Sequence, residues 1–323
     1  MEPILGNIGR LFGYPLTVVL PWRARGLLRA TLSSLFAAAL LWPCQPALAQ
    51  FRQDGNMLGS RCDGLGGGYS VALSGDGTTA IVGAAGTTPP YYSAYVYTVT
   101  PVAWSQQGCG LFANGYPAAE GAVAASADGN TVVLGAPTEQ LGPNAYSLGW
   151  VFARSGGTWS QQVELIGSNV NGGPFGTIVA LSADGDTAIV GVSLESNLTG
   201  AAWVFTRSSG VWSQQGPKLV GTGAIGEARQ GESVPLSGDG NTAIVGGLND
   251  NNGVGAAWVF TRSNGVWTQE AKLIGSDAVG AAHQGSSIAL SGDGNTAIVG
   301  GPQDNNSAGA VWVFTRSGGQ WTQ

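Results

Sequence analysis

Five aspartates recur along the chain in the motif Ser-x-Asp-Gly, and their spacing is the first feature that could support chemistry. They are Asp76, Asp128, Asp184, Asp239 and Asp293. A calcium site needs six to eight oxygen ligands, usually including several carboxylates. Each motif supplies one carboxylate, except that Asp186 follows Asp184 closely. An aspartate in a tight turn commonly hydrogen-bonds its own backbone, so turn chemistry is the favoured interpretation and no metal ligand is assigned.

Two other polar loops carry more oxygen atoms, Asp250-Asn251-Asn252 and Asp304-Asn305-Asn306. We interpret both as polar turns as well, because Asp and Asn are common turn residues. If these loops do not bind calcium, the stability of the protein is independent of it.

Residues for catalysis are sparse. The chain has one histidine, His283, in a loop rich in glycine and alanine, where we expect a solvated side chain. There is no histidine pair or Cys-x-x-Cys motif for zinc. Four arginines recur once per repeat and are interpreted as consensus positions: Arg154, Arg207, Arg262 and Arg316. No set of residues meets the requirements of an active site, so we predict that the protein is not an enzyme, with no catalytic residue and no cofactor.

The elements that carry these residues form a repeat with three markers. The Ser-x-Asp-Gly motif begins at Ser74, Ser126, Ser182, Ser237 and Ser291, at intervals of 52, 56, 55 and 54 residues. An aromatic-Val-aromatic triplet begins at Tyr95, Trp150, Trp203, Trp258 and Trp312. A further tryptophan follows nine residues later, at Trp104, Trp159, Trp212, Trp267 and Trp321. Nine of the 11 tryptophans therefore occupy two repeat positions, which indicates a structural role.

Each repeat reads as four β-strands. In the fourth repeat we expect strands at 233–237, 242–246, 256–262 and 266–275, with a tight hairpin at Ser263-Asn264-Gly265. Trp258 and Phe260 should lie on one face of the third strand and Val259 on the other, because side chains alternate along a strand. Apolar residues at helical spacing are interrupted by glycine throughout, so we predict essentially no helix.

Strands one to three carry apolar residues on both faces, so both faces of each sheet must be covered. Sheets of near-identical sequence covered on both faces are typical of β-propeller blades, and we predict an all-β propeller of about five blades. A linear β-solenoid is the rival, but its rungs are usually about 20–30 residues long.

The repeat resembles the FG-GAP repeat of integrin α-subunit propellers and of bacterial exported proteins. Phe175-Gly176, Gly135-Ala136-Pro137 and the near match Gly300-Gly301-Pro302 carry the literal motif, and the resemblance covers residues 51–323. It is closest to a bacterial subgroup with the consensus LSGDGNTAIVGG. Integrin-type blades carry a calcium loop of the form D-x-[DN]-x-D-G-x-x-D, and here that connection is shortened to Ser-Gly-Asp-Gly-Asn.

Propeller sialidases are also similar in outline, since they carry turns of the form S-x-D-x-G-x-T-W. The turn at Ser74-Gly75-Asp76-Gly77 places glycine one position early and lacks the aromatic residue. A sialidase-like glycan hydrolase is therefore the least favoured function.

The N-terminus is typical of an export signal. Arg23, Arg25 and Arg29 precede an apolar run at 30–42, and Ala47-Leu48-Ala49 forms a small-x-small cleavage site. We predict a signal peptide with an N-terminal extension at 1–49 and a propeller at 50–323. The five repeats fall at about 60–112, 113–166, 167–220, 221–274 and 275–323. The expected location is secreted, periplasmic or at the cell surface, and the alternative for the apolar run is a membrane anchor.

Charge and cysteines restrict the partners. Removing residues 1–49 takes away four arginines and one glutamate, which leaves nine basic and 18 acidic residues and a net charge of −9. Nucleic acid and anionic membranes are therefore poor partners. Cys62 and Cys109 remain; a disulfide between them is one prediction, and two separately buried thiols are the alternative.

Differences between the loops of the repeats indicate a function. We expect a binding or adhesion module that presents rim loops to a protein or glycan ligand, because the loops at 138–149 and 192–200 differ from their counterparts. The alternative is a structural repeat segment or a fragment of a larger surface protein. The oligomeric state is left open.

Residues 51–58 align with the fourth strand of a repeat. We predict that they complete the outer strand of the last blade and close a five-bladed ring. The rival is an open arc cut from a longer ring, perhaps of seven blades, with unpaired edges that favour aggregation.

Overall fold

The computed structural model describes residues 6–11, 14–18, 67–84, 94–100, 103–112, 122–135, 140–142, 145–171 and 177–323. The chain separates into two units, Met1–Asp54 and Gly55–Gln323. In the first unit, β1 (Gly6–Leu11) and β2 (Tyr14–Val18) pair as an antiparallel hairpin. The apolar run at 30–42 and the cleavage motif at 47–49 lie outside the described residues, so the signal peptide and the domain boundary at 49 stay predictions.

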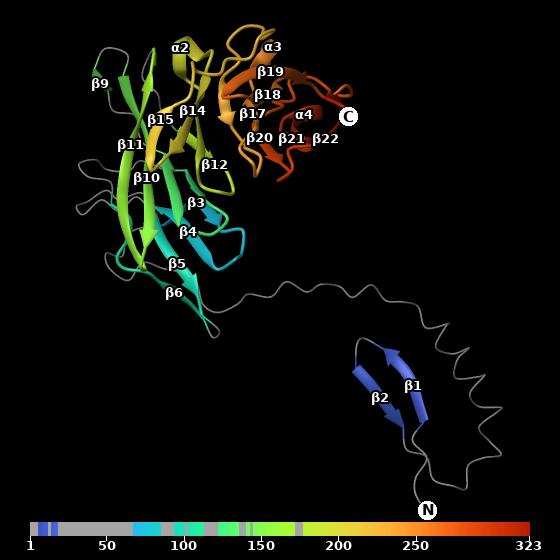
Figure 1. The fold of residues 1–323 in the computed structure, drawn as a ribbon. Helices are drawn as coiled ribbons and strands as arrows, with labels where there is room; N and C mark the ends of the chain where they lie inside the picture. Colours follow the sequence, from blue (N-terminus) through green and yellow to red (C-terminus); the bar gives the residue numbers. More distant parts are fainter. Residues whose placement is uncertain are drawn as a thin grey trace, which may run out of the picture. The chain divides into compact units, whose positions relative to one another are not determined.

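The second unit contains five successive antiparallel sheets, each with its four main strands in chain order (Figure 1). The first is β3 (Gly67–Leu73), β4 (Thr79–Ala84), β5 (Ala94–Val99) and β6 (Trp104–Gln106). The second is β7 (Val123–Ala125), β8 (Thr131–Gly135), β10 (Ala145–Ser155) and β11 (Thr158–Ser168), with β9 (Gln140–Gly142) beside β10. The third is β12 (Thr177–Leu181), β13 (Thr187–Val192), β14 (Ala201–Ser208) and β15 (Val211–Gln214). The fourth is β16 (Gln230–Ser233), β17 (Thr242–Gly247), β18 (Ala256–Ser263) and β19 (Val266–Leu273). The fifth is β20 (Ser287–Leu290), β21 (Thr296–Gly301), β22 (Ala310–Ser317) and β23 (Gln320–Thr322).

The prediction of essentially no helix is confirmed. The helices among the described residues are single turns between the second and third strands: α2 (Glu195–Leu198), α3 (Asp250–Gly253) and α4 (Asp304–Ser307). Each contains two consecutive residues with left-handed backbone, such as Asn251 and Asn252 in α3. They are tight loops rather than packed helices.

One strand differs from its predicted position. The sequence predicts the first strand of the fourth sheet at 233–237, whereas β16 is Gln230–Ser233. Beyond β16 only Leu236 forms an isolated bridge, with Ala243. Pro235 has no N–H group and cannot donate to the ladder, which explains why regular pairing does not continue through it.

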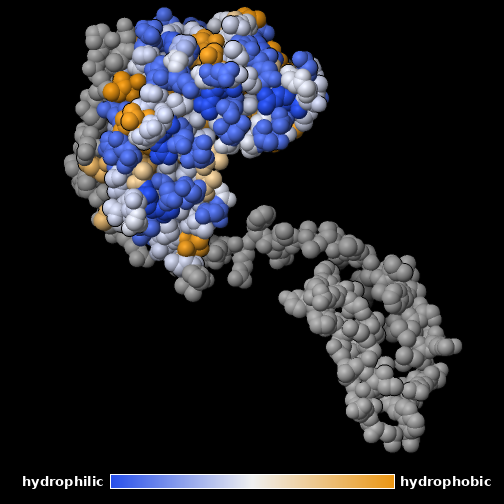
Figure 2. Space-filling model, in the orientation of Figure 1, coloured by the Kyte–Doolittle hydropathy of each residue, from blue (hydrophilic) through white to orange (hydrophobic). Residues whose placement is uncertain are grey.

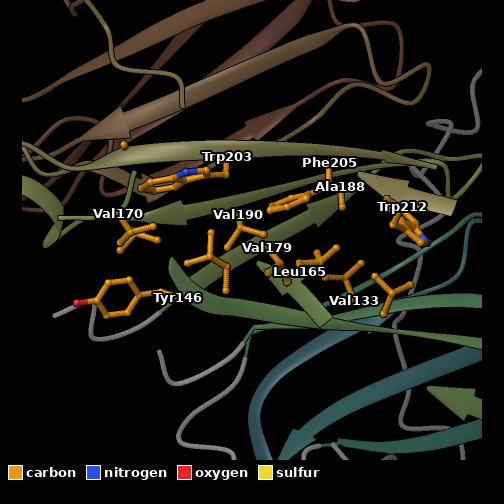
Figure 3. Close-up of a cluster of buried hydrophobic side chains, with 14 residues drawn as sticks. Val133, Tyr146, Leu165, Val170, Val179, Ala188, Val190, Trp203, Phe205 and Trp212 are labelled. Atoms are coloured by element: carbon orange, nitrogen blue, oxygen red, sulfur yellow. The ribbon is translucent and has the colours of Figure 1, made fainter. Parts of the chain in front are cut away.

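Consecutive sheets pack face to face. Because side chains alternate along the third strand, successive residues of that strand pack against the preceding and the following sheet in turn. Trp203 and Phe205 of β14 point toward the second sheet, where they form a buried cluster with Leu165 and other residues (Figure 3). Val204, between them, belongs to the cluster shared with Trp258 of the fourth sheet. The alternation predicted from the sequence is confirmed, and the inner sheets are covered on both faces. The unit is an all-β propeller fold of four-stranded blades.

Among the described residues, the fifth sheet is packed against another sheet on one face only. Trp312 and Phe314 are buried against the fourth sheet, whereas Val311 and Val313 are 64% and 49% exposed. The closing strand that the sequence predicts at 51–58 lies outside the described residues. Closure of a five-bladed ring therefore stays a prediction.

Candidate functional site

The antiparallel order gives the stack of sheets two different rims. The turn rim holds the first-to-second strand turns that contain the Ser-x-Asp-Gly motifs and the third-to-fourth strand turns such as 264–265. The loop rim, at the opposite strand ends, holds the second-to-third connections with α2, α3 and α4. It also holds the fourth-to-first connections, at 215–229 and 274–286. For the fourth and fifth sheets, both loop-rim connections lie entirely within the described residues.

The turn rim repeats one hydrogen-bond pattern. In each of the five Ser-x-Asp-Gly turns, the serine Oγ donates to the aspartate Oδ1 over 2.5–2.6 Å. The same Oγ accepts the N–H of the threonine that begins the next strand, at 2.9–3.0 Å. The aspartates are therefore bound within their own turns, as the sequence interpretation expects.

These hydrogen bonds affect the acidity of the turn carboxylates. The pKa of Asp76, Asp128, Asp239 and Asp293 lies below the ordinary aspartate value. For Asp76 and Asp293 the main cause of the lowered pKa is the serine hydroxyl, followed by a backbone N–H group. Hydrogen bonds to the charged form favour that form.

Neighbouring turns are also bonded to one another. Ala127 N–H donates to the carbonyl of Ala183 (2.9 Å), Ala183 to that of Gly238 (2.8 Å), and Gly238 to that of Gly292 (2.8 Å). A continuous chain of backbone hydrogen bonds thus joins the second to the fifth sheet. This rim holds the blades together.

The repeated arginines add a second link at the same rim. Arg262 Nε donates to Asn241 of its own sheet, at 2.9 Å. Its Nη1 reaches the third sheet, at Thr187 Oγ1 (3.2 Å) and Gln215 Oε1 (3.1 Å). Arg154 and Arg316 make equivalent contacts. Three of the four consensus arginines are therefore interblade ties, whereas the fourth, Arg207, pairs with Asp186 of its own sheet.

The loop rim is built around three buried acids at the start of α2, α3 and α4. Glu195, Asp250 and Asp304 are all buried, and Asp250 is only 1% exposed. Asp250 Oδ1 accepts the Ile225 N–H at 2.7 Å, and Asp304 Oδ1 accepts the Val279 N–H at 2.6 Å. The loops at 250–252 and 304–306 are turns, as expected, but their carboxylates point inward and organise the connection beside them.

Two of the three acids are paired with the only two lysines of the chain. Lys272 Nζ lies 2.7 Å from Asp250 Oδ2, donates to the Gly223 carbonyl at 2.7 Å, and sits 5.0 Å above the Trp258 ring. Lys218 pairs with Glu195 in the third sheet and lies over Trp203. Sequence reasoning missed these pairs. The sequence does contain an indication of them, because the loop acids and the lysines recur at nearly the same spacing along the chain.

Backbone contacts fix the shape of the loop rim. Asn251 N–H donates to the Ile225 carbonyl at 2.9 Å, which complements the Ile225 bond to Asp250. The same connection is bonded to the preceding blade, since Arg229 N–H donates to Leu198 and Gln230 N–H to Thr199, both at 2.9 Å. Each connection is therefore held between the turns of two blades.

Glycine is required where the connection crosses a tryptophan. A Cβ atom at Gly221 would lie 2.2 Å from the Trp258 ring, and one at Gly275 would lie 2.3 Å from Trp312. At such a distance another residue would fit only if the backbone or the tryptophan ring shifted. The backbones of the connections at 215–229 and 274–286 therefore follow the same path, although their exposed side chains differ.

Arg229 and His283 occupy equivalent positions with an unusual backbone. Both have a φ of 55°, in the left-handed region that non-glycine residues rarely adopt. His283 is half-buried rather than solvated, and its Nε2 lies close to Gly253. Backbone strain of this kind is a reason to examine a position for function.

The side chains at the tips of the loop rim reach solvent. Ile225 and Val279 are 56% and 55% exposed, and the paired asparagines of α3 and α4 are exposed beside them. Figure 2 shows one face of the molecule, on which hydrophobic residues form small separate patches within a hydrophilic or neutral surface. The loop rim thus presents isolated aliphatic side chains among amides.

Other predicted features have different outcomes. The loop at 192–200 lies on the loop rim, and the one at 138–149 lies partly outside the described residues. Cys109 is disulfide-bonded. The other cysteines, Cys44 and Cys62, lie outside the described residues, so the Cys62–Cys109 pairing stays a prediction. In the described part of the chain, no cluster of His, Cys, Asp and Glu could hold a metal ion. No helix among these residues could cross a membrane.

Solved structures of other proteins are similar in fold to this chain. The chain resembles TolB from Acinetobacter baumannii with a TM-score of 0.44 and 11% identity, over 78% of this chain and 52% of that one. It therefore spans about half the length of that protein. A functionally unknown protein from Desulfotomaculum acetoxidans gives a TM-score of 0.49 and 15% identity, over 78% of this chain and 67% of that one. No curated protein matches.

The FG-GAP repeat model matches residues 267–314. This segment runs from β19 of the fourth sheet through β20, β21 and most of β22 of the fifth. The matched repeat therefore spans two blades, and it contains the fifth Ser-x-Asp-Gly turn and the fifth aromatic triplet, whose counterparts recur in the other sheets. The chain is a repeat β-propeller protein that carries the FG-GAP motif.

Proposed function

We propose that this protein is an exported binding module, without catalytic activity, whose loop rim contacts a protein partner. The observation that carries the proposal is the contrast between fixed backbone and changing side chains on that rim. Equivalent positions hold Ile225 and Val279, Glu227 and Ala281, and Arg229 and His283. The hydrogen bonds that shape the connections are the same in both blades.

The chemistry of the rim favours a protein over a sugar or a nucleic acid. In the described part of the rim, the rings of Trp203, Trp258 and Trp312 are buried, so they offer no open face on which a sugar could stack. The net charge of −9 for residues 50–323 disfavours contact with phosphates. The exposed side chains of Ile225 and Val279 lie near Arg229 and the asparagines of α3 and α4. This mixture suits a moderately polar protein interface.

Export is supported by two independent features. The N-terminal sequence has the basic, apolar and small-residue segments of a signal peptide. Cys109 is disulfide-bonded, and disulfides persist mainly in oxidising compartments. The proposal therefore places the partner at the cell envelope or outside the cell.

Paired variants test the proposal. The protein is displayed to envelope and surface proteins of the producing cell, cross-linked, and analysed by mass spectrometry. Asp replaces Ile225 and Val279 in a loop-rim variant, and Ser209 and Asn264 in a turn-rim variant with the same added charge. The proposal expects a partner that is lost with the loop-rim variant and kept with the turn-rim variant. A partner lost only with the turn-rim variant contradicts it, and a glycan array reports whether the ligand is a sugar instead.

A second candidate, a structural segment of a larger assembly, rests on the exposed face of the fifth sheet. Val311 and Val313 lie on that face, where an inner blade would be covered. This function predicts that the protein self-associates through that face and that charged substitutions there make it monomeric. Sedimentation of the Val311→Asp variant distinguishes the two candidates, because the binding module does not require self-association.

A further inference from the structure

One basic side chain of the propeller is not used in holding the blades together. The described residues of the propeller unit contain seven lysines and arginines, and six of these donate hydrogen bonds within the structure: Arg154, Arg207, Lys218, Arg262, Lys272 and Arg316. The seventh is Arg229, on the loop rim. Its side chain forms no hydrogen bond or ion pair with any described residue, and its Nε is buried without a partner.

The backbone at Arg229 is held firmly, although its side chain is not. The Arg229 N–H donates to the Leu198 carbonyl of α2 at 2.9 Å, and the next residue, Gln230, is fully buried. Gln230 Nε2 donates to the Gly221 carbonyl at 3.0 Å, and its Oε1 accepts the Gly221 N–H. His283 has the same φ of 55° as Arg229, so the left-handed backbone belongs to the shared path of the connection and not to the arginine. The guanidinium is therefore carried on a fixed base.

Arg229 lies at the junction of the third and fourth sheets, each of which packs against a sheet on both of its faces. A charged donor that loses water without gaining an acceptor costs free energy, and buried polar groups of this kind are rare in folded proteins. Glu227 and Glu232 are close to it in the sequence, but neither is paired with it in the described structure. The side chain thus adds no hydrogen bond or ion pair to the fold, and recognition is the role that its chemistry supports.

We propose, on the basis of the function proposed above for the loop rim, that Arg229 binds the carboxylate of an Asp or Glu side chain of the protein partner. A guanidinium presents five N–H donors in a planar fork that matches the two oxygens of a carboxylate. Arginine is also one of the residues that most often dominate the binding energy of an interface. Ile225, on the same connection, is 56% exposed. The partner therefore places an aliphatic residue beside its acid.

The charge of the chain makes such a site selective. Residues 50–323 contain nine basic and 18 acidic residues, so most of the surface repels an acidic group. An acid of the partner is accepted at Arg229 and disfavoured elsewhere, which fixes the orientation of the complex as well as its affinity. The equivalent position of the next blade holds His283, which lacks the permanent charge and the fork of donors. The two connections share a backbone path and differ in what they recognise.

Selection from a library of random dodecapeptides, displayed on phage, tests this site on the purified full chain. We expect the selected peptides to share an Asp or Glu next to an aliphatic residue. Synthesised with a fluorescent label, they should bind the Arg229→Gln variant at least about tenfold more weakly than the wild type, because a charge-assisted hydrogen bond is lost. Replacing the shared acid by its amide should weaken binding to the wild type by a similar factor. The same replacement should have little further effect on binding to Arg229→Gln, since the two groups act as a pair.

Asn264→Asp, on the turn rim, changes the net charge by the same amount as Arg229→Gln and is the matched control, which should leave binding unchanged. Thermal unfolding separates recognition from a structural role. Because the Arg229 side chain makes no bond, Arg229→Gln should unfold at the same temperature as the wild type or at a higher one, and a lower temperature contradicts the proposal.

Selection of no peptide that depends on Arg229, or of peptides without a shared acid, overturns the proposal. Peptides weakened by Ile225→Ser but not by Arg229→Gln overturn it while leaving the loop rim as the binding surface. Peptides weakened only by Asn264→Asp contradict the proposed function of the loop rim as well.

Discussion

The two rims of the propeller use the same repeat in opposite ways. On the turn rim, Ser237, Asp239 and their equivalents keep both their identity and their hydrogen bonds from blade to blade. On the loop rim, the bonds around Asp250 and Asp304 are kept, while the exposed residues between them change. Residues that keep both identity and hydrogen bonds serve assembly of the blades, and the exposed residues between the conserved bonds of the loop rim are free to vary for recognition.

The loop rim contains buried ion pairs, so a single substitution there should lower the stability of the protein more than one on the turn rim. Lys272→Ala should leave Asp250 buried without a cation, which costs about 3–5 kcal/mol when one partner of a buried pair is removed. Chemical unfolding should show the loss. The double variant Lys272→Met with Asp250→Asn should recover much of it, and an unchanged midpoint in the single variant would show that the pair is not needed.

The turn rim should respond more weakly to loss of one hydroxyl. Ser237→Ala leaves the buried N–H of Thr242 without its side-chain acceptor, which costs about 1–3 kcal/mol. Ser213→Ala, at an exposed strand position, is the control and should have no measurable effect. If Ser237→Ala destabilises the protein more than Lys272→Ala does, the ranking of the two rims is wrong.

Acid should weaken the turn rim gradually. The pKa values of Asp76, Asp128, Asp239 and Asp293 are lower in the folded protein than the ordinary value of 3.8. Their contribution to stability is therefore complete above that value and is lost as pH falls below it through the lowered pKa values, because the unfolded chain then binds more protons. Unfolding midpoints measured from pH 5 to pH 2.5 should fall. Asp293→Asn should make the fall shallower, and a midpoint that rises would contradict the assignment.

Calcium should have the smallest effect. The turn carboxylates are bonded in their turns, and Glu195 and Asp250 are paired with lysine. A ligand at a hundredfold excess over its dissociation constant stabilises a fold by about 2.7 kcal/mol. Melting in EDTA and in millimolar calcium should therefore agree. A clear rise with calcium would assign a cation site to one of the polar loops.

Much of the fold is readable from the sequence because it depends on local pattern repeated five times. The alternation of Trp258, Val259 and Phe260 predicts their faces correctly, and the hairpin at Asn264-Gly265 has the left-handed backbone that its residues favour. The register of β16 is not readable in this way. There, Pro235 ends the pairing that the pattern alone would continue.

The loop rim is less predictable, for a physical reason. The loop at 250–252 looks like a solvated polar turn, and only the three-dimensional arrangement shows that Asp250 is buried against Lys272, 22 positions away. The ion pair could have been suspected from the equal spacing of the lysines and the loop acids. The strain at His283 could not, because it depends on contacts with the preceding blade.

Site-specific cross-linking tests whether the loop rim is the surface that binds a partner. A photo-crosslinking residue replaces Ile225 or Val279 on the loop rim, and Asn264 on the turn rim, in protein exported by living cells. We predict that positions 225 and 279 form adducts with the same partner protein and that position 264 forms none. Adducts from position 264 with no adduct from 225 or 279 would contradict it.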